Sequence, residues 1–506
     1  MLRSHTPPTE GQASLSEKAT ESRIFRMDRG RGTPWAVRAV LRVGVVGLVA
    51  AYALLVPPAA AQPPTAPAPG TPTPGAPTKP GTPTAPGAPT APTESTTGVP
   101  EGPTPSGILP NVQIPGVLLP PRGPFDFLLY PAPAQGPLTV TPSFAITEQF
   151  NDNVFLTHSN KQSDFITQFT PGVTLQAQQP GLQLFSNFNF TAEIYAKNSE
   201  LDNAANRLAF LTSVFYQATQ RVSLTLTESL GYNRNSNLVA VSGVSSGRES
   251  SWVNVIAPAV SVQLTPRTTW RVYGSYTLER FGSGETNSSS QNSSSQSSNL
   301  YHVGTGFGYT LTPRLTLTAD YDFGYLDVEH EPTAYVHTLR FGGSYQVLPS
   351  LTVTASAGPS ITLTDHDTEV TPSVAARITK QMSWGFMSAF YEQGIGTNGA
   401  FGGISNNQTF GGNITVTTLM RGLYLDLSPR YSITRTTGAS QSNADINALN
   451  VVLSARYQIA RYIGLIASYN LLHQTGSANG TSRNSNDVDQ NSVTFGVQFG
   501  YPINFY

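Results

Sequence analysis

From Leu138 onward the chain alternates apolar and polar residues with a period of two, and this feature limits its fold more than any other. In residues 315–325, one parity carries Leu, Leu, Ala, Tyr, Phe and Tyr, and the other carries Thr, Thr, Asp, Asp and Gly. Successive side chains of a β-strand point to opposite faces, so this segment predicts a strand with one apolar and one polar face. No sustained helical period follows residue 137.

Short turns and long polar connections alternate along this part of the chain. Residues 312–314 form a short Thr-Pro-Arg connection, whereas residues 282–298 are almost all Ser, Asn, Gln and Gly. Short turns on one rim and long loops on the other are typical of an outer-membrane barrel. We therefore predict an all-β fold, a transmembrane antiparallel up-and-down β-barrel over residues 137–506. Counting segments gives about 18 strands (16–20), and an even number places both barrel ends on the short-turn side.

The composition agrees with a barrel that faces lipid. Charged residues make up 12 % of the chain and hydrophobic residues 39 %, against roughly 25 % charged residues in soluble domains. An extracellular β-sandwich array fits the composition too, but it gives no reason for alternating short and long connections. The net charge of −1 provides no basic surface for nucleic acid. The absence of cysteine excludes disulfides and a thiol nucleophile.

The first 61 residues have the pattern of an export signal. Residues 43–56 form the one continuous apolar stretch, and 14 residues are too few for a spanning helix, which needs about 20. Arginines precede this stretch, and Ala59, Ala60 and Ala61 follow it. This order predicts a signal peptide cut after Ala61, with Met27 as the true start. An uncleaved N-terminal anchor is the alternative.

Residues 62–136 are rich in proline and predict a disordered periplasmic linker. From 62 to 105 the chain is almost wholly Pro, Thr, Ala and Gly, which cannot bury enough apolar surface to offset the entropy of ordering. A passive spacer is one reading, and a segment that binds a periplasmic or cell-wall partner is the other. From 107 to 135 the chain becomes more apolar, so that part either docks on the barrel, enters it or lies loose.

The chain ends with an alternating strand closed by Phe505 and Tyr506. An apolar last strand that ends in aromatic residues resembles the signal read by the outer-membrane assembly machinery, which is therefore an expected partner besides outer-membrane lipid. The lipid-facing parity ends on Phe505, whereas Tyr506 is out of phase. A closing strand with its aromatic residues at the membrane interface is compatible with both readings.

Two short motifs in the first hairpins resemble those of a known group. The segments are Asp152-Asn153-Val154-Phe155 and Thr170-Pro171-Gly172-Val173-Thr174-Leu175. They are similar to motifs of outer-membrane β-barrel porins, some of which accompany exopolysaccharide export systems. The resemblance implies a barrel and a pore and provides no catalytic residues. It also suggests a polysaccharide-export system as a partner.

Charged residues on the polar parity are the candidate pore-lining residues. An Arg or Lys on the lipid face at mid-membrane costs roughly 2–4 kcal/mol, so these charges are expected to point inward. They are Glu193, Lys197, Arg207, Arg271, Glu279, Asp320, Asp322, Arg340, Arg377, Asp426, Arg430 and Arg456. Either they tune selectivity or they form ion pairs that stiffen the wall, and their near balance of sign favours neither anions nor cations. Gly304, Gly306 and Gly308 leave room for a solute or for tyrosines of a neighbouring strand.

Catalytic and metal-binding patterns are weak. His330 and His366 each stand between two acidic residues on successive long loops. This pattern is compatible with a divalent cation or acid–base chemistry, but solvated loop charge is the favoured interpretation. No nucleophile-elbow, phosphate-loop or zinc-protease motif occurs. We predict no enzyme and no cofactor. The expected function is a porin-like channel for small hydrophilic solutes or a saccharide chain; alternatives are a non-conducting structural or assembly barrel and, last, a surface enzyme.

Two features conflict with smooth strands. Prolines recur inside the predicted strands, and their repeated distance from the short turns predicts a shared bulge or kink. They are Pro142, Pro171, Pro258, Pro359, Pro372 and Pro429. Glu228 falls on the lipid-facing parity of Leu224 and Leu226, which predicts a bulge or an early strand end there.

Overall fold

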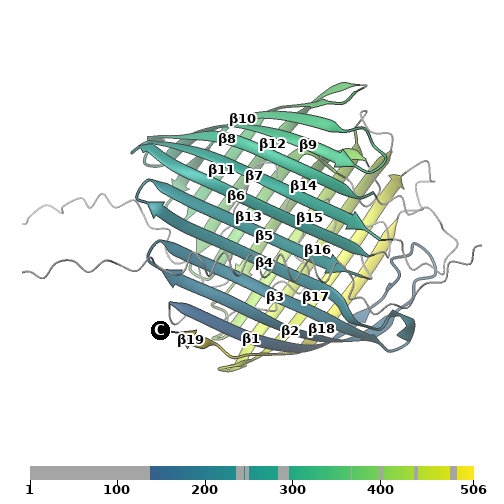
Figure 1. Ribbon diagram of the computed structural model, residues 1–506. Helices are drawn as coiled ribbons and strands as arrows, with labels where there is room; N and C mark the ends of the chain where they lie inside the picture. Colours follow the sequence, from purple (N-terminus) through teal and green to yellow (C-terminus); the bar gives the residue numbers. More distant parts are fainter. Residues whose placement is uncertain are drawn as a thin grey trace, which may run out of the picture. The chain divides into compact units, whose positions relative to one another are not determined.

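The computed structural model describes residues 137–234, 244, 250–282, 296–365, 367–397, 403–437, 443–478 and 487–505. The expected signal region (1–61), the proline-rich linker (62–136), His366 and Tyr506 lie outside these ranges, so those predictions stay predictions. The described residues form one antiparallel sheet that closes on itself, with each strand paired to its sequence neighbours (Figure 1).

The first half of the wall consists of β1 (Leu138–Asn151), β2 (Asp164–Gln179), β3 (Leu182–Tyr195), β4 (Asn203–Thr219), β5 (Val222–Asn233), β6 (Ser251–Thr265), β7 (Thr268–Phe281), β8 (Ser298–Thr312) and β9 (Leu315–Val328). The second half consists of β10 (Ala334–Leu348), β11 (Leu351–Leu363), β12 (Thr368–Met382), β13 (Gly385–Thr397), β14 (Ile404–Val416), β15 (Leu423–Thr436), β16 (Ala444–Ala460), β17 (Ile463–Ala478), β18 (Val488–Gly500) and β19 (Ile503–Phe505).

The segments β18 and β19 are two parts of one barrel strand. Ser143 of β1 pairs with Gly500 and Val140 pairs with Ile503, which keeps a single register across the break. The break falls at Pro502, which has no N–H to donate to the ladder. The closed barrel therefore has 18 strands, as predicted, and β1 and the C-terminal segment meet on the short-turn side.

The described residues contain a single helical turn, η1 (Ser199–Leu201), in the connection between β3 and β4. Among these residues no helix is long and apolar enough to cross a membrane.

The outward face of the barrel is apolar and is bounded by aromatic residues. The exposed fractions of Val303, Phe341 and Phe495 are 60 %, 61 % and 58 %. A wall with so much exposed apolar surface is stable in contact with hydrocarbon and not in contact with water. Near the loop end, tyrosines on four successive strands form a row with ring centroids 4.8–5.9 Å apart: Tyr276, Tyr301, Tyr325 and Tyr335. Such a row is the aromatic girdle expected at a membrane interface. Fold and surface together define a transmembrane barrel of the outer-membrane type.

No register shift in the described strands lies at a proline, which corrects the expectation of a shared proline bulge. Most shifts lie beside the short turns, and one lies between Thr191 and Glu193 near the loop end of β3. Register shifts occur between Gln217 and Thr219, and between Gln263 and Thr265, close to turns. Around Pro171 the ladder loses pairs but resumes in the same register. Glu228 likewise stays in register, opposite Thr212 and Ile256, so β5 runs on to Asn233 with an acidic residue on its outward parity.

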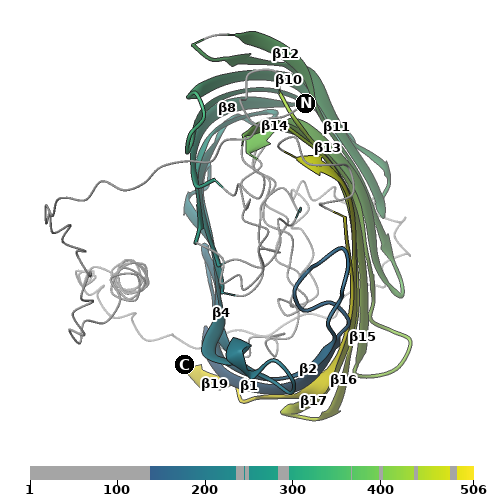
Figure 2. The same ribbon diagram turned by 90° about the vertical axis from the view of Figure 1, so that its right-hand side faces the viewer.

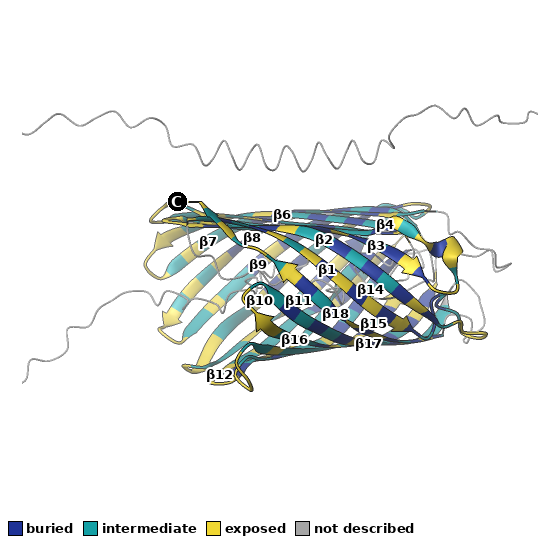
Figure 3. Cartoon of the chain, turned by 90° about the horizontal axis from the view of Figure 1, so that it is seen from below, coloured by how far each residue is buried: buried dark blue, intermediate teal, exposed yellow. Residues whose placement is uncertain are grey.

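Buried side chains gather in the loop half of the barrel, whereas the short-turn half is more accessible (Figure 3). In β8 and β10, which both begin at the loop end, inward residues are buried over the first half of the strand and accessible near the turn. Seen along its axis the barrel wall is oval, with β4 and β8 on one long side and β13 and β15 on the other (Figure 2). Inward side chains are therefore packed most tightly near the loops.

Candidate functional site

The inner face of β7–β10 carries a charged group that we call the β7–β10 cluster: Arg271, Tyr273, His302, Asp320, Asp322 and Arg340. Register creates it, because Arg271, Gly306, Asp320 and Arg340 stand in one row across four strands. Arg271 Nη2 donates to Asp320 Oδ1 at 2.9 Å, and His302 Nδ1 lies 3.0 Å from Asp322 Oδ1. The predicted inward residues Arg271, Asp320, Asp322 and Arg340 are thus brought together.

Glycines make room for this cluster. A Cβ at Gly304 would collide with the ring of Tyr273, and one at Gly306 would collide with the carboxylate of Asp320. The side chains on β7 and β9 can therefore lie flat across β8. Of the two uses suggested by the glycine-rich sequence of β8, packing against a neighbouring tyrosine is the one observed at Gly304.

Several polar atoms of the cluster are buried without a hydrogen-bond partner among the described residues. They are Arg271 Nε, Tyr273 Oη, Asp322 Oδ2 and Arg340 Nη2. Tyr273, Asp322 and Arg340 are each less than a tenth exposed. A buried polar group without a partner is costly, so the ion pairs of this cluster do not satisfy it fully.

A second charged group, the β12–β16 cluster, occupies another part of the inner wall: Arg377, Phe390, Glu392, Asp426, Arg430 and Arg456. Arg377, Phe390, Gly411 and Arg430 form one row. Arg377 lies 3.6 Å from Glu392 and its guanidinium sits 5.0 Å from the centre of the Phe390 ring. The ring occupies the space above Gly411. This cluster is partly accessible, with 18 % of the Arg377 side chain and 24 % of the Glu392 side chain exposed.

Asp426 is bound by neutral partners. Asn413 Nδ2 and Thr415 Oγ1 each donate to Asp426 Oδ2 at 2.8 Å, and Ser428 Oγ donates to Oδ1 at 2.8 Å. Arg456, on β16, stands opposite Tyr424 of β15. Polar hydroxyl and amide groups therefore stabilise the carboxylate of Asp426 on the inner face.

Glu193 lies at the loop end of β3 in a saturated network and is only 2 % exposed. It pairs with Arg207, and it accepts from Tyr195 Oη at 2.8 Å and Asn206 Nδ2 at 2.9 Å. Lys197 differs from its predicted position, because β3 ends at Tyr195 and Lys197 is exposed beyond it. The cause is Asp164, whose carboxylate accepts the backbone N–H groups of Lys197 and Asn198 and turns the chain.

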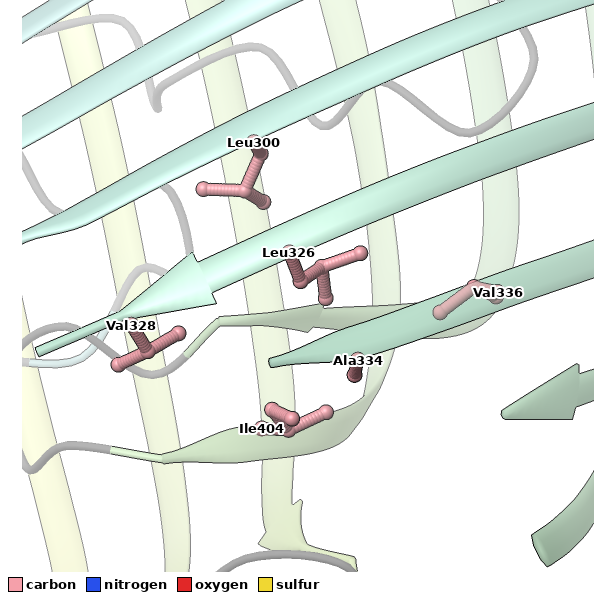
Figure 4. Close-up of a cluster of buried hydrophobic side chains, with 6 residues drawn as sticks. All are labelled: Leu300, Leu326, Val328, Ala334, Val336 and Ile404. Atoms are coloured by element: carbon pink, nitrogen blue, oxygen red, sulfur yellow. The ribbon is translucent and has the colours of Figure 1, made fainter. Parts of the chain in front are cut away.

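The loop-side ends of β13 and β14 pack against the inner face of β8–β10, an arrangement that we call the wall overlap. Ile404 joins an apolar cluster with Leu300, Leu326 and Val336, and Ile395 packs against it (Figure 4). Glu279 of β7 accepts from Thr397 Oγ1 at 2.9 Å. In Figure 2, β13 and β14 lie inside the arc of β8, β10 and β12.

The overlap begins where β12 and β13 separate. Their ladder runs from Met382–Gly385 only to Val374–Gln393, and the remaining residues of β13 pair with β14 alone in the described part of the chain. Just beyond Val374, Pro372 stands directly opposite Pro359 of β11. Pro372 has no N–H to donate to a neighbouring strand, although β12 keeps its pairing with β11 as far as Thr368. Beyond Val374 the end of β13 packs inward.

Another contact crosses the interior. Val244, in the connection between β5 and β6, is 1 % exposed and packs against Ala444, Ile446 and Ala448 on the inner face of β16. The loop half of the barrel is thus crossed at two places, by the wall overlap and by the contact of Val244.

Sequence reasoning missed Glu392, Tyr273 and Phe390 as members of the site. In β13 both parities carry aromatic or polar residues, so alternation gives no clear inward face. The suggested histidine pair is not brought together in the described residues: His330 lies in the turn after β9 with φ 64°, and His366 lies outside them. Within the described ranges no group of three His, Cys, Asp or Glu side chains is placed to hold a metal ion.

Comparison with known proteins gives structural neighbours only. No family model and no curated protein matches the sequence. Solved structures that resemble the chain include Pseudomonas aeruginosa OccK11 (OpdR), with TM-score 0.35 and 11 % identity over 72 % of this chain and 96 % of that one. Acinetobacter baumannii OccAB4 has a TM-score of 0.37 and 11 % sequence identity, and the match covers 74 % of this chain and 100 % of that one. At this level of similarity the properties of these neighbours do not transfer to this chain.

Proposed function

We propose that the chain is a porin-like outer-membrane channel that lets small hydrophilic solutes, or a saccharide chain, pass by diffusion. The observation that supports this best is the division of the wall into an apolar outward face and an inner face of hydroxyl, amide and charged side chains. An inner face that only stiffened the barrel could be apolar throughout, as in a packed core. The mechanism is steric and electrostatic, and it requires no catalytic group.

Planar-bilayer recording of the refolded full chain tests this proposal, with a variant lacking residues 62–136 beside it. Steady conductance of both proteins is the expected result, and it would make the proline-rich segment a spacer. Conductance of the truncated variant alone would make that segment a plug. If neither protein conducts, although heat-modifiable electrophoretic mobility shows that both are folded, the proposal is overturned in favour of a structural or assembly barrel.

The motifs at 152–155 and 170–175 support a finer proposal, that the channel accompanies an exopolysaccharide export system. Deleting the chain from its host and measuring secreted polysaccharide tests this. Unchanged secretion would remove the association while leaving the channel proposal intact.

A further inference from the structure

The wall overlap separates two kinds of inner surface. On β8–β10 the inward residues next to the loops are apolar and covered: Leu326 is 1 % exposed and Val336 is 4 % exposed. Directly below them lie His302 and Asp322 of the β7–β10 cluster, each less than a tenth exposed. This side of the interior is therefore covered from the loop end down to His302, Asp322 and Arg340. Arg271 of the same cluster, on β7 and nearer the short turns, is accessible, with 38 % of its side chain exposed.

The residue types of β13 and β14 in the overlap agree with strand ends that do not face lipid. Ile395, Thr397 and Ile404 share the face on which Phe410, nearer the short turns, is exposed outward by 46 %. Near the loops the same face also carries Gln393 and Asn406, whose side-chain amides are 3.4 Å apart. Polar residues on an outward parity are unsuited to lipid. They fit a strand end that has left the lipid boundary.

The inner face of β3–β5 has different properties. Its middle residues Asn187, Ser213, Thr225 and Ser229 are partly accessible and carry no charge. Of these strands, β4 stands across the oval from β15 (Figure 2), and the β12–β16 cluster is also partly accessible. Apart from Arg271, the accessible polar wall described here lies away from the overlap.

We infer that the wall overlap partitions the interior of the barrel, so that solutes pass along the inner face of β3–β5 and opposite the β12–β16 cluster, and not past His302, Asp322 and Arg340 of the β7–β10 cluster. This inference rests on the proposed function. It assigns solute contact to neutral hydroxyl and amide groups on one side and to arginines with one accessible carboxylate on the other. The buried residues His302, Asp322 and Arg340 then hold the wall together and do not select solutes.

Single cysteines test the partition, because the natural chain contains none. Val336→Cys and Thr338→Cys report on the covered wall; Ser229→Cys and Thr225→Cys report on the wall of the route. Each full-length variant is treated with a small charged methanethiosulfonate, and the modified fraction is followed by mass. We expect the β5 cysteines to react about tenfold faster or more than the β10 cysteines. Equal rates on both walls would overturn the partition.

A second substitution asks whether the overlap causes the protection. Ile404→Asp in the Val336→Cys background places a charge in a fully buried apolar site, which should release the strand ends and raise the rate of modification about tenfold. Ile404→Val is the matched control and should leave the rate unchanged. If Ile404→Asp leaves the rate of modification unchanged while heat-modifiable mobility shows that the barrel is folded, the partition is also overturned.

The mass readout does not depend on conduction. A protein that never conducts but shows the expected pattern of modification would refute the channel and leave the partition standing. A conducting protein with equal rates would refute the partition alone.

Discussion

At the scale of single residues, the inner wall is shaped by side chains that lie across glycines on the next strand. Tyr273 covers Gly304, Phe390 covers Gly411, and the ring of His302 approaches Gly324. In each case the larger residue and the glycine are neighbours in the ladder. The ring occupies the surface above the glycine, where a side chain of that strand would otherwise lie. The glycine and the ring therefore pack as one unit.

Gly304→Ala should therefore destabilise the barrel. The added Cβ would collide with the ring of Tyr273, and overpacking of this kind typically costs about 1–3 kcal/mol. We expect a lower temperature for the heat-induced mobility shift in electrophoresis. Gly308→Ala, on the same strand and inner face, is the control: its Cβ would meet nothing closer than 3.8 Å. Equal effects of the two substitutions would contradict this packing account.

Alternation predicted which way many of these residues point, but it could not predict what they meet. Asp320 and Asp322 stand on the polar parity of β9 and are inward, as the sequence indicates. Their partners depend on register across β8, where Gly306 lets Arg271 reach Asp320 from two strands away. Nothing in a single sequence fixes that register, because the turn lengths vary and small bulges occur beside them.

At the scale of elements, the loop between β1 and β2 holds the barrel's closing seam. Asp152 accepts from the backbone N–H and side-chain amide of Asn491 of β18, each at 2.7 Å. Asn153 Nδ2 donates to the carbonyl of Asp489 at 2.9 Å, and Gln490 Nε2 donates to the carbonyl of Asn153 at 2.9 Å. The motif that the sequence singled out therefore ties the first strand to the last near the loops.

Asp152→Ala should weaken this seam. It leaves the Asn491 side-chain amide without its acceptor, and loss of hydrogen bonds to a charged group costs about 1.5–3 kcal/mol each at partly buried sites. We expect faster unfolding of the barrel in urea, followed by the electrophoretic shift. Asp445→Ala is a matched control at another loop end, because its ion pair with Arg435 is exposed and worth about 0–1 kcal/mol. The seam account fails if the control is as harmful as Asp152→Ala.

The same scale shows where the alternation rule stops working. The rule assigns Gln393, Thr397 and Asn406 to the lipid side, and near the short turns the face they share does look outward. The wall overlap reverses this near the loops, because the end of β13 leaves β12 and packs against β9. The alternation rule assumes that one face of the sheet contacts lipid and the other contacts water. It cannot predict a place where one part of the sheet packs against the inner face of another part.

At the scale of the whole molecule, the two charged clusters differ in how they would affect ions in the proposed channel. In the β12–β16 cluster Arg377 and Arg430 stand in one row, and Glu392 is the neighbouring carboxylate 3.6 Å from Arg377. In the β7–β10 cluster, His302, Asp322 and Arg340 are each less than a tenth exposed. Selectivity should therefore respond to charge changes in the first cluster and not to changes at these buried residues of the second.

Glu392→Gln should shift the channel toward anions, because it removes a negative charge beside two arginines. The measurement is the reversal potential across a bilayer under a KCl gradient, where the natural chain is expected near zero. Asp322→Asn removes the same charge from the β7–β10 cluster and is expected to leave that potential unchanged. A shift produced by Asp322→Asn, and none by Glu392→Gln, would place the ion route on the opposite wall.

The wall overlap has one more consequence, for the relation between strand number and bore. In a regular barrel the diameter grows with the number of strands and is the same at both rims. Here two strand ends lie inside the wall at one rim only, so the loop end is enclosed by fewer strands than the short-turn end. In the proposed channel the bore is therefore narrower at the loop end than at the short-turn end, and we expect such an asymmetric bore with charged walls to pass ions more readily in one direction than in the other.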